Sequence, residues 1–158
     1  MGEGSLLMEG IGELITPMPV LDGWMVIVKP EASFPTPAIY RAWDGGGFES
    51  VRGSTTMKDA VEAQDLRAVA QELTNDLERA AGVISEIPGQ LIELLKQSGA
   101  MGAQMSGSGS ACFGIFENEA AAQDASLQLR AELAKDVHLR NSQLFVAPFC
   151  PRGVEVAP

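Results

Sequence analysis

The chain has few of the residues that cross-link small proteins or hold metal ions. Its 158 residues include two cysteines, Cys112 and Cys150, and one histidine, His138. The cysteines form no Cys-x-x-Cys pair, so the sequence offers neither a disulfide framework nor the ligands of a zinc site. We expect both cysteines to be small buried residues in a reducing compartment, and we expect no metal site.

Basic residues and long apolar runs are also scarce. Lysine and arginine number 11 against 21 aspartate and glutamate residues, which leaves a formal net charge of −10. Such an acidic chain repels polyphosphate backbones, which disfavours nucleic acid as a ligand. Apolar runs such as residues 25–28 are far shorter than the ~20 residues of a membrane-spanning helix, and the first residues lack a basic signal region. We expect a cytoplasmic protein that binds neither nucleic acid nor membrane.

The residues that are present predict a single α+β domain over residues 1–158. Hydrophobic residues make up 46% of the chain, enough for a substantial core. Periodicity predicts strands at 5–9, 13–16, 24–28, 100–105, 111–116 and 143–149, and helices at 37–43, 58–73, 77–95 with a break or kink at Pro88, and 119–135. Pro17 and Pro19 are expected to exclude regular structure around them. From residue 24 onward, this order predicts a ferredoxin-like split β-α-β fold, an antiparallel sheet with helices on one face.

The segment Ser106-Gly107-Ser108-Gly109-Ser110 is the most unusual local feature. Its two glycines permit a left-handed backbone and a close ligand approach, and successive amide groups in such a turn can form a nest for an anion. No Gly-Lys-Ser/Thr follows, and a strand rather than a helix comes next, so the segment fits neither a Walker loop nor a dinucleotide fingerprint. Composition alone favours a flexible hairpin loop over a phosphate site.

Two helix starts allow more than one interpretation. Thr36 before Pro37 fits an N-cap followed by proline in the first helical turn. Tyr40 offers a ring on which a planar base stacks, although the residues alone favour a core position. Asn75 fits the N-cap of a further helix, with Glu78 as its reciprocal partner in a capping box. A single histidine supports no Ser–His–Asp or Cys–His set, so no catalytic residue is assigned in this chain.

Five segments and a short tail together match the pattern of one known family. They are residues 8–13, 24–30, 35–37, 75–78 and 102–110, with the tail at 152–154. In these segments the chain resembles the C-terminal domain of the GHMP small-molecule kinases. The glycine loop is specific to that superfamily. The strand and Pro-Thr-Pro block at 24–37 and the helix start at 75–78 resemble the branch that uses ATP to phosphorylate the 2-hydroxyl of a cytidine-diphosphate-linked methylerythritol in non-mevalonate isoprenoid biosynthesis.

The resemblance implies roles for particular residues. The loop residues placed beside the nucleotide phosphates are Ser106, Gly107, Ser108, Gly109 and Ser110. Thr36 and Tyr40 match positions that line the acceptor's cytidine site, where an aromatic ring stacks on the base. The implied cofactor of the full-length enzyme is ATP, which brings Mg²⁺ with it, and none is intrinsic to this chain.

The family's N-terminal ATP-binding domain has no counterpart in these 158 residues. Since phosphoryl transfer needs charge neutralisation and a positioned nucleophile, we expect this phosphotransferase domain to be inactive as an isolated chain. Its expected partners are a small-molecule substrate and the missing kinase domain. The face toward that domain should be exposed and favour self-association. A free-standing small-molecule-binding or regulatory module, and one subunit of a split kinase, stay open as alternatives.

Overall fold

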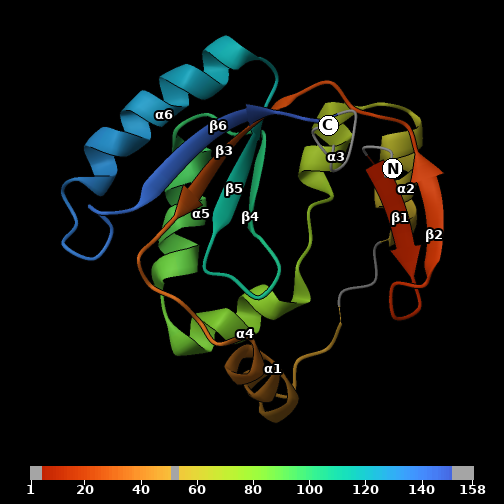
Figure 1. The fold of residues 1–158 in the computed structure, drawn as a ribbon, viewed down its shortest axis with the longest axis horizontal. Helices are drawn as coiled ribbons and strands as arrows, with labels where there is room; N and C mark the ends of the chain where they lie inside the picture. The colour runs from red at the N-terminus through yellow and green to blue at the C-terminus, as the bar shows by residue number, and fades with distance from the viewer. Residues whose placement is uncertain (1–4, 51–53, 151–158) are drawn as a thin grey trace, which may run out of the picture.

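The structure is a computed structural model that describes residues 5–50 and 54–150 (Figure 1). The strands in these ranges are β1 (Ser5–Glu9), β2 (Leu14–Met18), β3 (Trp24–Lys29), β4 (Gly102–Met105), β5 (Cys112–Phe116) and β6 (Gln143–Pro148). The helices are α1 (Thr36–Gly45), α2 (Ser54–Glu62), α3 (Leu66–Gln71), α4 (Asp76–Ile84), α5 (Ile87–Gln97) and α6 (Glu119–Leu133). The tail at 152–154 lies outside the described residues.

A four-stranded antiparallel sheet with the order β4-β5-β3-β6 forms the centre of the fold (Figure 1). In β3, Val26 lies opposite Gly114 of β5 on one side and Val146 of β6 on the other. The continuous apolar run of β3 fits this position, because its side chains are buried on one face of the sheet and half-buried on the other. Helices connect β3 to β4 and β5 to β6, so the predicted α+β class and split β-α-β arrangement are confirmed.

The main core lies between one face of this sheet and helices α5 and α6. Leu91 of α5 and Leu129 of α6 are fully buried, and both helices repeat a buried leucine four residues later. They pack against side chains of the inner strand such as Val26 and Val28, which are also fully buried. Burying each such side chain stabilises the fold by about 1.5–3 kcal/mol.

The single helix predicted over residues 58–73 is wrong, because the helix is interrupted between α2 and α3. Gln64 has a positive φ of 53°, and the Asp65 side chain accepts a hydrogen bond from the Ala68 N–H at 3.0 Å, which caps α3. An aspartate N-cap therefore overrides an apolar stripe that continues through the break. Helix α3 packs beside β4 and contributes to a second, smaller apolar cluster that includes Ile115.

The helical stripe over residues 77–95 divides as predicted. Helix α4 ends at Ile84 and α5 begins at Ile87, with Pro88 in the first turn, where its missing N–H has no helical acceptor to lose. None of the helices within the described ranges combines the length and hydropathy needed to cross a lipid bilayer.

Strands β1 and β2 form a separate antiparallel hairpin that lies beside α2 (Figure 1). The predicted pair of strands is confirmed, but the expected effect of Pro17 is wrong: it lies inside β2, opposite Leu6. A two-stranded hairpin tolerates proline because each strand has an outer edge that needs no ladder N–H. The exposed apolar side chains of this hairpin are Leu6, Met8, Ile11, Leu14 and Ile15. They provide apolar surface for self-association, which stays a prediction.

Candidate functional site

The glycine loop joins β4 to β5 and extends from the sheet toward α4 and α1 (Figure 1). Ser106 N–H donates to the Ala111 carbonyl at 2.9 Å, and Gly109 N–H donates to the Ser106 carbonyl at 2.9 Å. Gly107 and Gly109 have φ values of 55° and 86°, in the left-handed region that favours glycine. The loop is thus a hydrogen-bonded turn that joins two antiparallel strands, so the predicted hairpin is confirmed, and its phosphate role stays a prediction.

Two amide groups of this loop stay available for a ligand. Among residues 5–50 and 54–150, no acceptor receives a hydrogen bond from the Gly107 or the Ser108 N–H. Gly107 is exposed and Ser108 is half-buried. Successive unpaired N–H groups beside a left-handed residue form the kind of concavity that binds an anionic oxygen.

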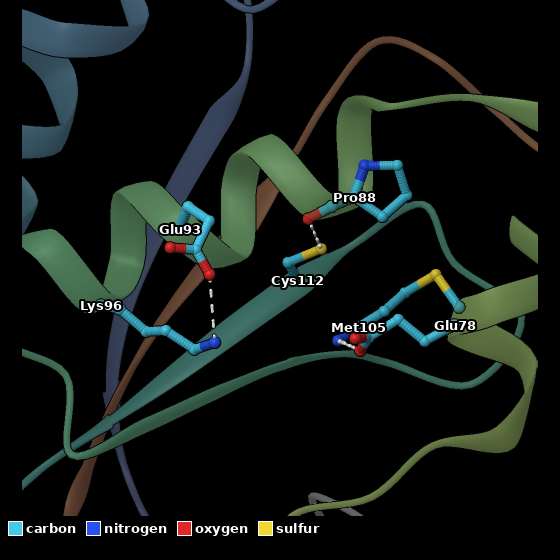
Figure 2. Close-up of polar contacts among 6 residues, drawn as sticks. All are labelled: Glu78, Pro88, Glu93, Lys96, Met105 and Cys112. Carbon is cyan, nitrogen blue, oxygen red and sulfur yellow. Dashed lines mark hydrogen bonds and ion pairs between the residues drawn. The ribbon is translucent and has the colours of Figure 1, made fainter. Parts of the chain in front are cut away.

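The start of α4 supports the base of the loop. Asn75 caps α4 as predicted, its Oδ1 accepting a hydrogen bond from the Leu77 N–H at 3.0 Å. The predicted capping box is wrong, because the Glu78 carboxylate accepts from the Met105 N–H at 3.1 Å instead of reaching back to Asn75 (Figure 2). Asn75 Nδ2 donates to the carbonyls of Met105 and Gly107, each at 2.8 Å.

Thr36 touches the glycine loop directly. Its Oγ1 lies 2.9 Å from Ser108 Oγ, so the two hydroxyls share a hydrogen bond across 72 positions of sequence. The expected N-cap role of Thr36 is wrong, because Pro35 occupies that position and Thr36 is the first helical residue. The hydroxyl that would have capped α1 is therefore directed at the loop.

Tyr40 lies one helical turn after Thr36 and is 52% exposed. The core position that the residues alone favoured is wrong, because Ile39, fully buried, takes the inward place on α1. Helix α1 is in turn fixed to α4 by Arg79, whose guanidinium lies 5.5 Å from the Trp43 ring centroid and 5.4 Å from that of Phe48. Cation–π contacts of this kind are worth about 0.5–2 kcal/mol.

Lys29 holds the far end of the loop. Its Nζ donates to the Pro30 carbonyl at 2.7 Å, to the Ala32 carbonyl at 3.3 Å and to Ser110 Oγ at 3.1 Å. Ser110 is buried, and its hydroxyl also donates to the Ala32 carbonyl. The segment that leads into α1 and the end of the glycine loop thus share one ammonium group.

The geometry brings together the sequence-predicted loop, Ser106–Ser110, and the predicted acceptor helix with Thr36 and Tyr40. The glycine loop lies in a part of the chain that matches a known family. The family described as GHMP kinases C terminal matches residues 57–135, half of the chain. The chain belongs to the GHMP kinase C-terminal family.

Individual relatives of this GHMP kinase domain agree. The chain is 37% identical over 121 residues to the 4-diphosphocytidyl-2-C-methyl-D-erythritol kinase of Acetivibrio thermocellus. This match covers 73% of the chain and 41% of the relative. The crystal structure of a 4-(cytidine 5'-diphospho)-2C-methyl-D-erythritol kinase matches with a TM-score of 0.66 and 26% identity over 87% of this chain and 47% of that one. A homoserine kinase from Cytophaga hutchinsonii shares the fold, with a TM-score of 0.72 and 15% identity over 94% of this chain and 49% of that one.

The chain spans less than half the length of the curated relatives it matches, 40% to 48% of each. The range that matches the family, residues 57–135, contains the glycine loop and the start of α4. In the part of the chain that the structure describes, no three His, Cys, Asp or Glu side chains gather where they could hold a metal ion.

Cys112 lies under the loop at the start of β5 and is fully buried. Its Sγ faces the Pro88 carbonyl at 3.7 Å (Figure 2). Burial, with a smaller contribution from the Glu78 carboxylate, raises the pKa of the Cys112 thiol to about 12. The thiol therefore stays protonated and is unsuited to act as a nucleophile. Cys150 is exposed, so the expectation that both cysteines are buried is wrong for this one.

This difference predicts selective alkylation. At pH 8, iodoacetamide should modify the exposed Cys150 and leave Cys112 unmodified until urea unfolds the chain, as mass spectrometry of peptides would show. Equal labelling of both cysteines in the folded protein would contradict the assignment.

The raised pKa of Cys112 also predicts a pH dependence of stability. The folded-state pKa of Cys112 lies above the ~8.5 of an unfolded thiol, so the unfolded state releases its proton first as pH rises. The free energy of unfolding should fall above about pH 9 for this reason.

Two supporting residues had no signal in the sequence. Lys29 follows an apolar strand and Arg79 lies on a helix, positions where a basic side chain usually reaches solvent. The contact of Lys29 with Ser110 spans 81 positions of the chain and that of Arg79 with Glu49 spans 30, so only the folded structure shows them. His138 is exposed, and its backbone N–H donates to the Asp136 carboxylate at 2.7 Å.

Proposed function

We propose that this chain is the C-terminal domain of an ATP-dependent kinase that phosphorylates the 2-hydroxyl of 4-diphosphocytidyl-2-C-methyl-D-erythritol. The named relatives and the 26% identical crystal structure support this acceptor. The observation that carries the proposal is the hydrogen bond between Thr36 and Ser108, which joins the acceptor helix to the glycine loop. A kinase needs its two substrates side by side, and a direct contact between residues of the two predicted sites supports this arrangement. ATP is supplied in the cytoplasm, where we propose that the enzyme acts.

In this proposal the loop binds phosphate oxygens and the helix binds the acceptor. The N–H groups of Gly107 and Ser108 donate to a phosphate oxygen and offset the negative charge that the transferring phosphoryl group carries. Thr36 and the exposed ring of Tyr40 line the cytidine side, where stacking on a base is worth ~1–3 kcal/mol. The domain would orient both substrates, and the groups that activate the hydroxyl would come from the family's N-terminal domain.

The 158-residue polypeptide allows a direct test. We expect no phosphorylation of the acceptor by ATP above background, and weak binding of cytidine diphosphate measured by calorimetry, because the chain supplies one wall of the pocket. Adding the N-terminal domain of a 4-diphosphocytidyl-2-C-methyl-D-erythritol kinase as a separate polypeptide is the companion experiment. Restored turnover would favour a split kinase, and tight binding by the chain alone would favour a free-standing binding module. Clear turnover by the chain alone would overturn the expected inactivity.

A further inference from the structure

We infer that Asn75 is a positioning residue that sets the direction of the Ser108 N–H. This inference rests on the proposed function, in which that N–H meets a phosphate oxygen. Sequence assigns Asn75 only to the cap of α4, and a cap needs only one side-chain oxygen. In the structure its carboxamide makes three hydrogen bonds, of which one reaches Met105 at the base of the glycine loop and another reaches Gly107 within it.

The three bonds use the carboxamide in the one orientation that satisfies every partner. Leu77 offers an N–H, which only the Asn75 oxygen can accept, whereas Met105 and Gly107 offer carbonyls, which only the Asn75 nitrogen can serve. The two donor distances are both 2.8 Å, within the normal range for N–H···O bonds. Aspartate at position 75 would keep the N-cap oxygen but lose the N–H donors. Serine would also keep an N-cap oxygen, but its side chain is too short to reach the carbonyls of Met105 and Gly107.

The geometry of the peptide bond turns these contacts into an orientation. In a trans peptide the carbonyl and the following N–H point in opposite directions. Because the Gly107 carbonyl is directed at Asn75, the Ser108 N–H is directed away from α4 and out of the loop. The preceding contact follows the same rule: the Met105 carbonyl is directed at Asn75, and the Ser106 N–H on the other side donates to the Ala111 carbonyl.

Glu78 fixes the same segment from one turn further along α4. Its carboxylate accepts the Met105 N–H at 3.1 Å (Figure 2), so Met105 is held through both its N–H and its carbonyl. The loop therefore leaves β4 from a fixed point. Asn75 is the contact that reaches beyond this point, onto Gly107.

The chain offers a matched control for the cap itself. Asn118 caps α6 with the same chemistry, its Oδ1 accepting from the Ala121 N–H at 3.0 Å. Its Nδ2 donates to no acceptor among the described residues, and α6 lies away from the glycine loop (Figure 1). Asn75→Ser and Asn118→Ser therefore both replace one good N-cap by another, and only the first removes contacts to the loop.

The experiment is an NMR study of the 158-residue chain and these two variants. In the wild type, the side-chain amide protons of Asn75 should exchange with solvent about tenfold more slowly than those of Asn118, because two hydrogen bonds protect them. In Asn75→Ser, the ¹⁵N heteronuclear NOE of Gly107 and Ser108 should fall to values typical of mobile backbone. In Asn118→Ser, the heteronuclear NOE values of Gly107 and Ser108 should stay as in the wild type.

A titration with inorganic pyrophosphate separates this inference from the proposed function. We expect saturable shifts of the Gly107 and Ser108 amides in the wild type, about tenfold weaker binding in Asn75→Ser, and unchanged binding in Asn118→Ser. Absence of shifts in the wild type would count against the phosphate role of the loop, while the exchange and NOE data would still decide the role of Asn75. Equal exchange of the two side-chain amides, or an unchanged loop NOE in Asn75→Ser, would overturn the inference. If Asn75→Ser fails to fold, the wild-type exchange comparison alone decides it.

Discussion

Replacing Lys29 by methionine should lower the free energy of unfolding by about 2–4 kcal/mol, because three oxygen atoms lose a charged donor. Methionine keeps much of the apolar stem, so the packing of β3 is little changed. The Pro30 carbonyl belongs to a fully buried residue, and Ser110 is 1% exposed, so water replaces the lost ammonium poorly at both places. Urea denaturation followed by circular dichroism measures the effect.

The matched control is Lys96→Met on α5. Lys96 makes a surface ion pair with Glu93 at 3.2 Å, and both side chains are at least half exposed (Figure 2). Exposed pairs of this kind contribute about 0–1 kcal/mol, so the control should stay close to the wild type. If Lys29→Met were as stable as Lys96→Met, Lys29 would be an ordinary solvent-facing lysine and its link between the loop and the acceptor segment would be refuted.

The sheet could be predicted because its signals are local. The apolar run of β3 and the glycine loop between two short apolar runs depend on residues that are neighbours in sequence. The same holds for the helix break near Pro88. Strand order then follows from the split β-α-β pattern, since each of the two helical connections crosses over one strand. The break between α2 and α3 also depends on a local signal, because an aspartate before an apolar turn, here Asp65, is a strong N-cap.

The polar contacts of the candidate site could not be predicted, because they join distant parts of the chain. Thr36 and Glu78 both have a local partner that sequence rules favour, the first turn of α1 and the Asn75 N–H. In the folded protein Thr36 binds Ser108 of the glycine loop, across 72 positions, and Glu78 binds Met105 at the end of β4, across 27 positions. Pro35 takes the N-cap position of α1, so the Thr36 hydroxyl is not used as a cap. Without Glu78, the Met105 N–H would be buried without an acceptor. The partners of Thr36 and Glu78 are therefore set by hydrogen bonds between distant parts of the chain, not by the local helix starts.

The second large effect is expected from Gly109→Ala, which should lower the free energy of unfolding by about 2–3 kcal/mol. A φ of 86° is strained for alanine, and the added Cβ would lie 2.7 Å from Met105 Sδ and 3.2 Å from Phe34. Met105 is 1% exposed, so its sulfur has little room to move. The loop should shift away from the position in which its amides face outward, and the pyrophosphate-induced amide shifts should be lost.

Gly107→Ala separates the two causes of this effect. Gly107 is also left-handed, with a φ of 55°, but a Cβ there would meet nothing within 4 Å. This variant should lose only about 1 kcal/mol, from backbone strain alone. The difference between the two alanine variants measures how tightly Met105 and Phe34 press on the loop. Equal losses would mean that the loop is held by its glycine conformations alone, and that the buried methionine beneath it has no part in shaping the site.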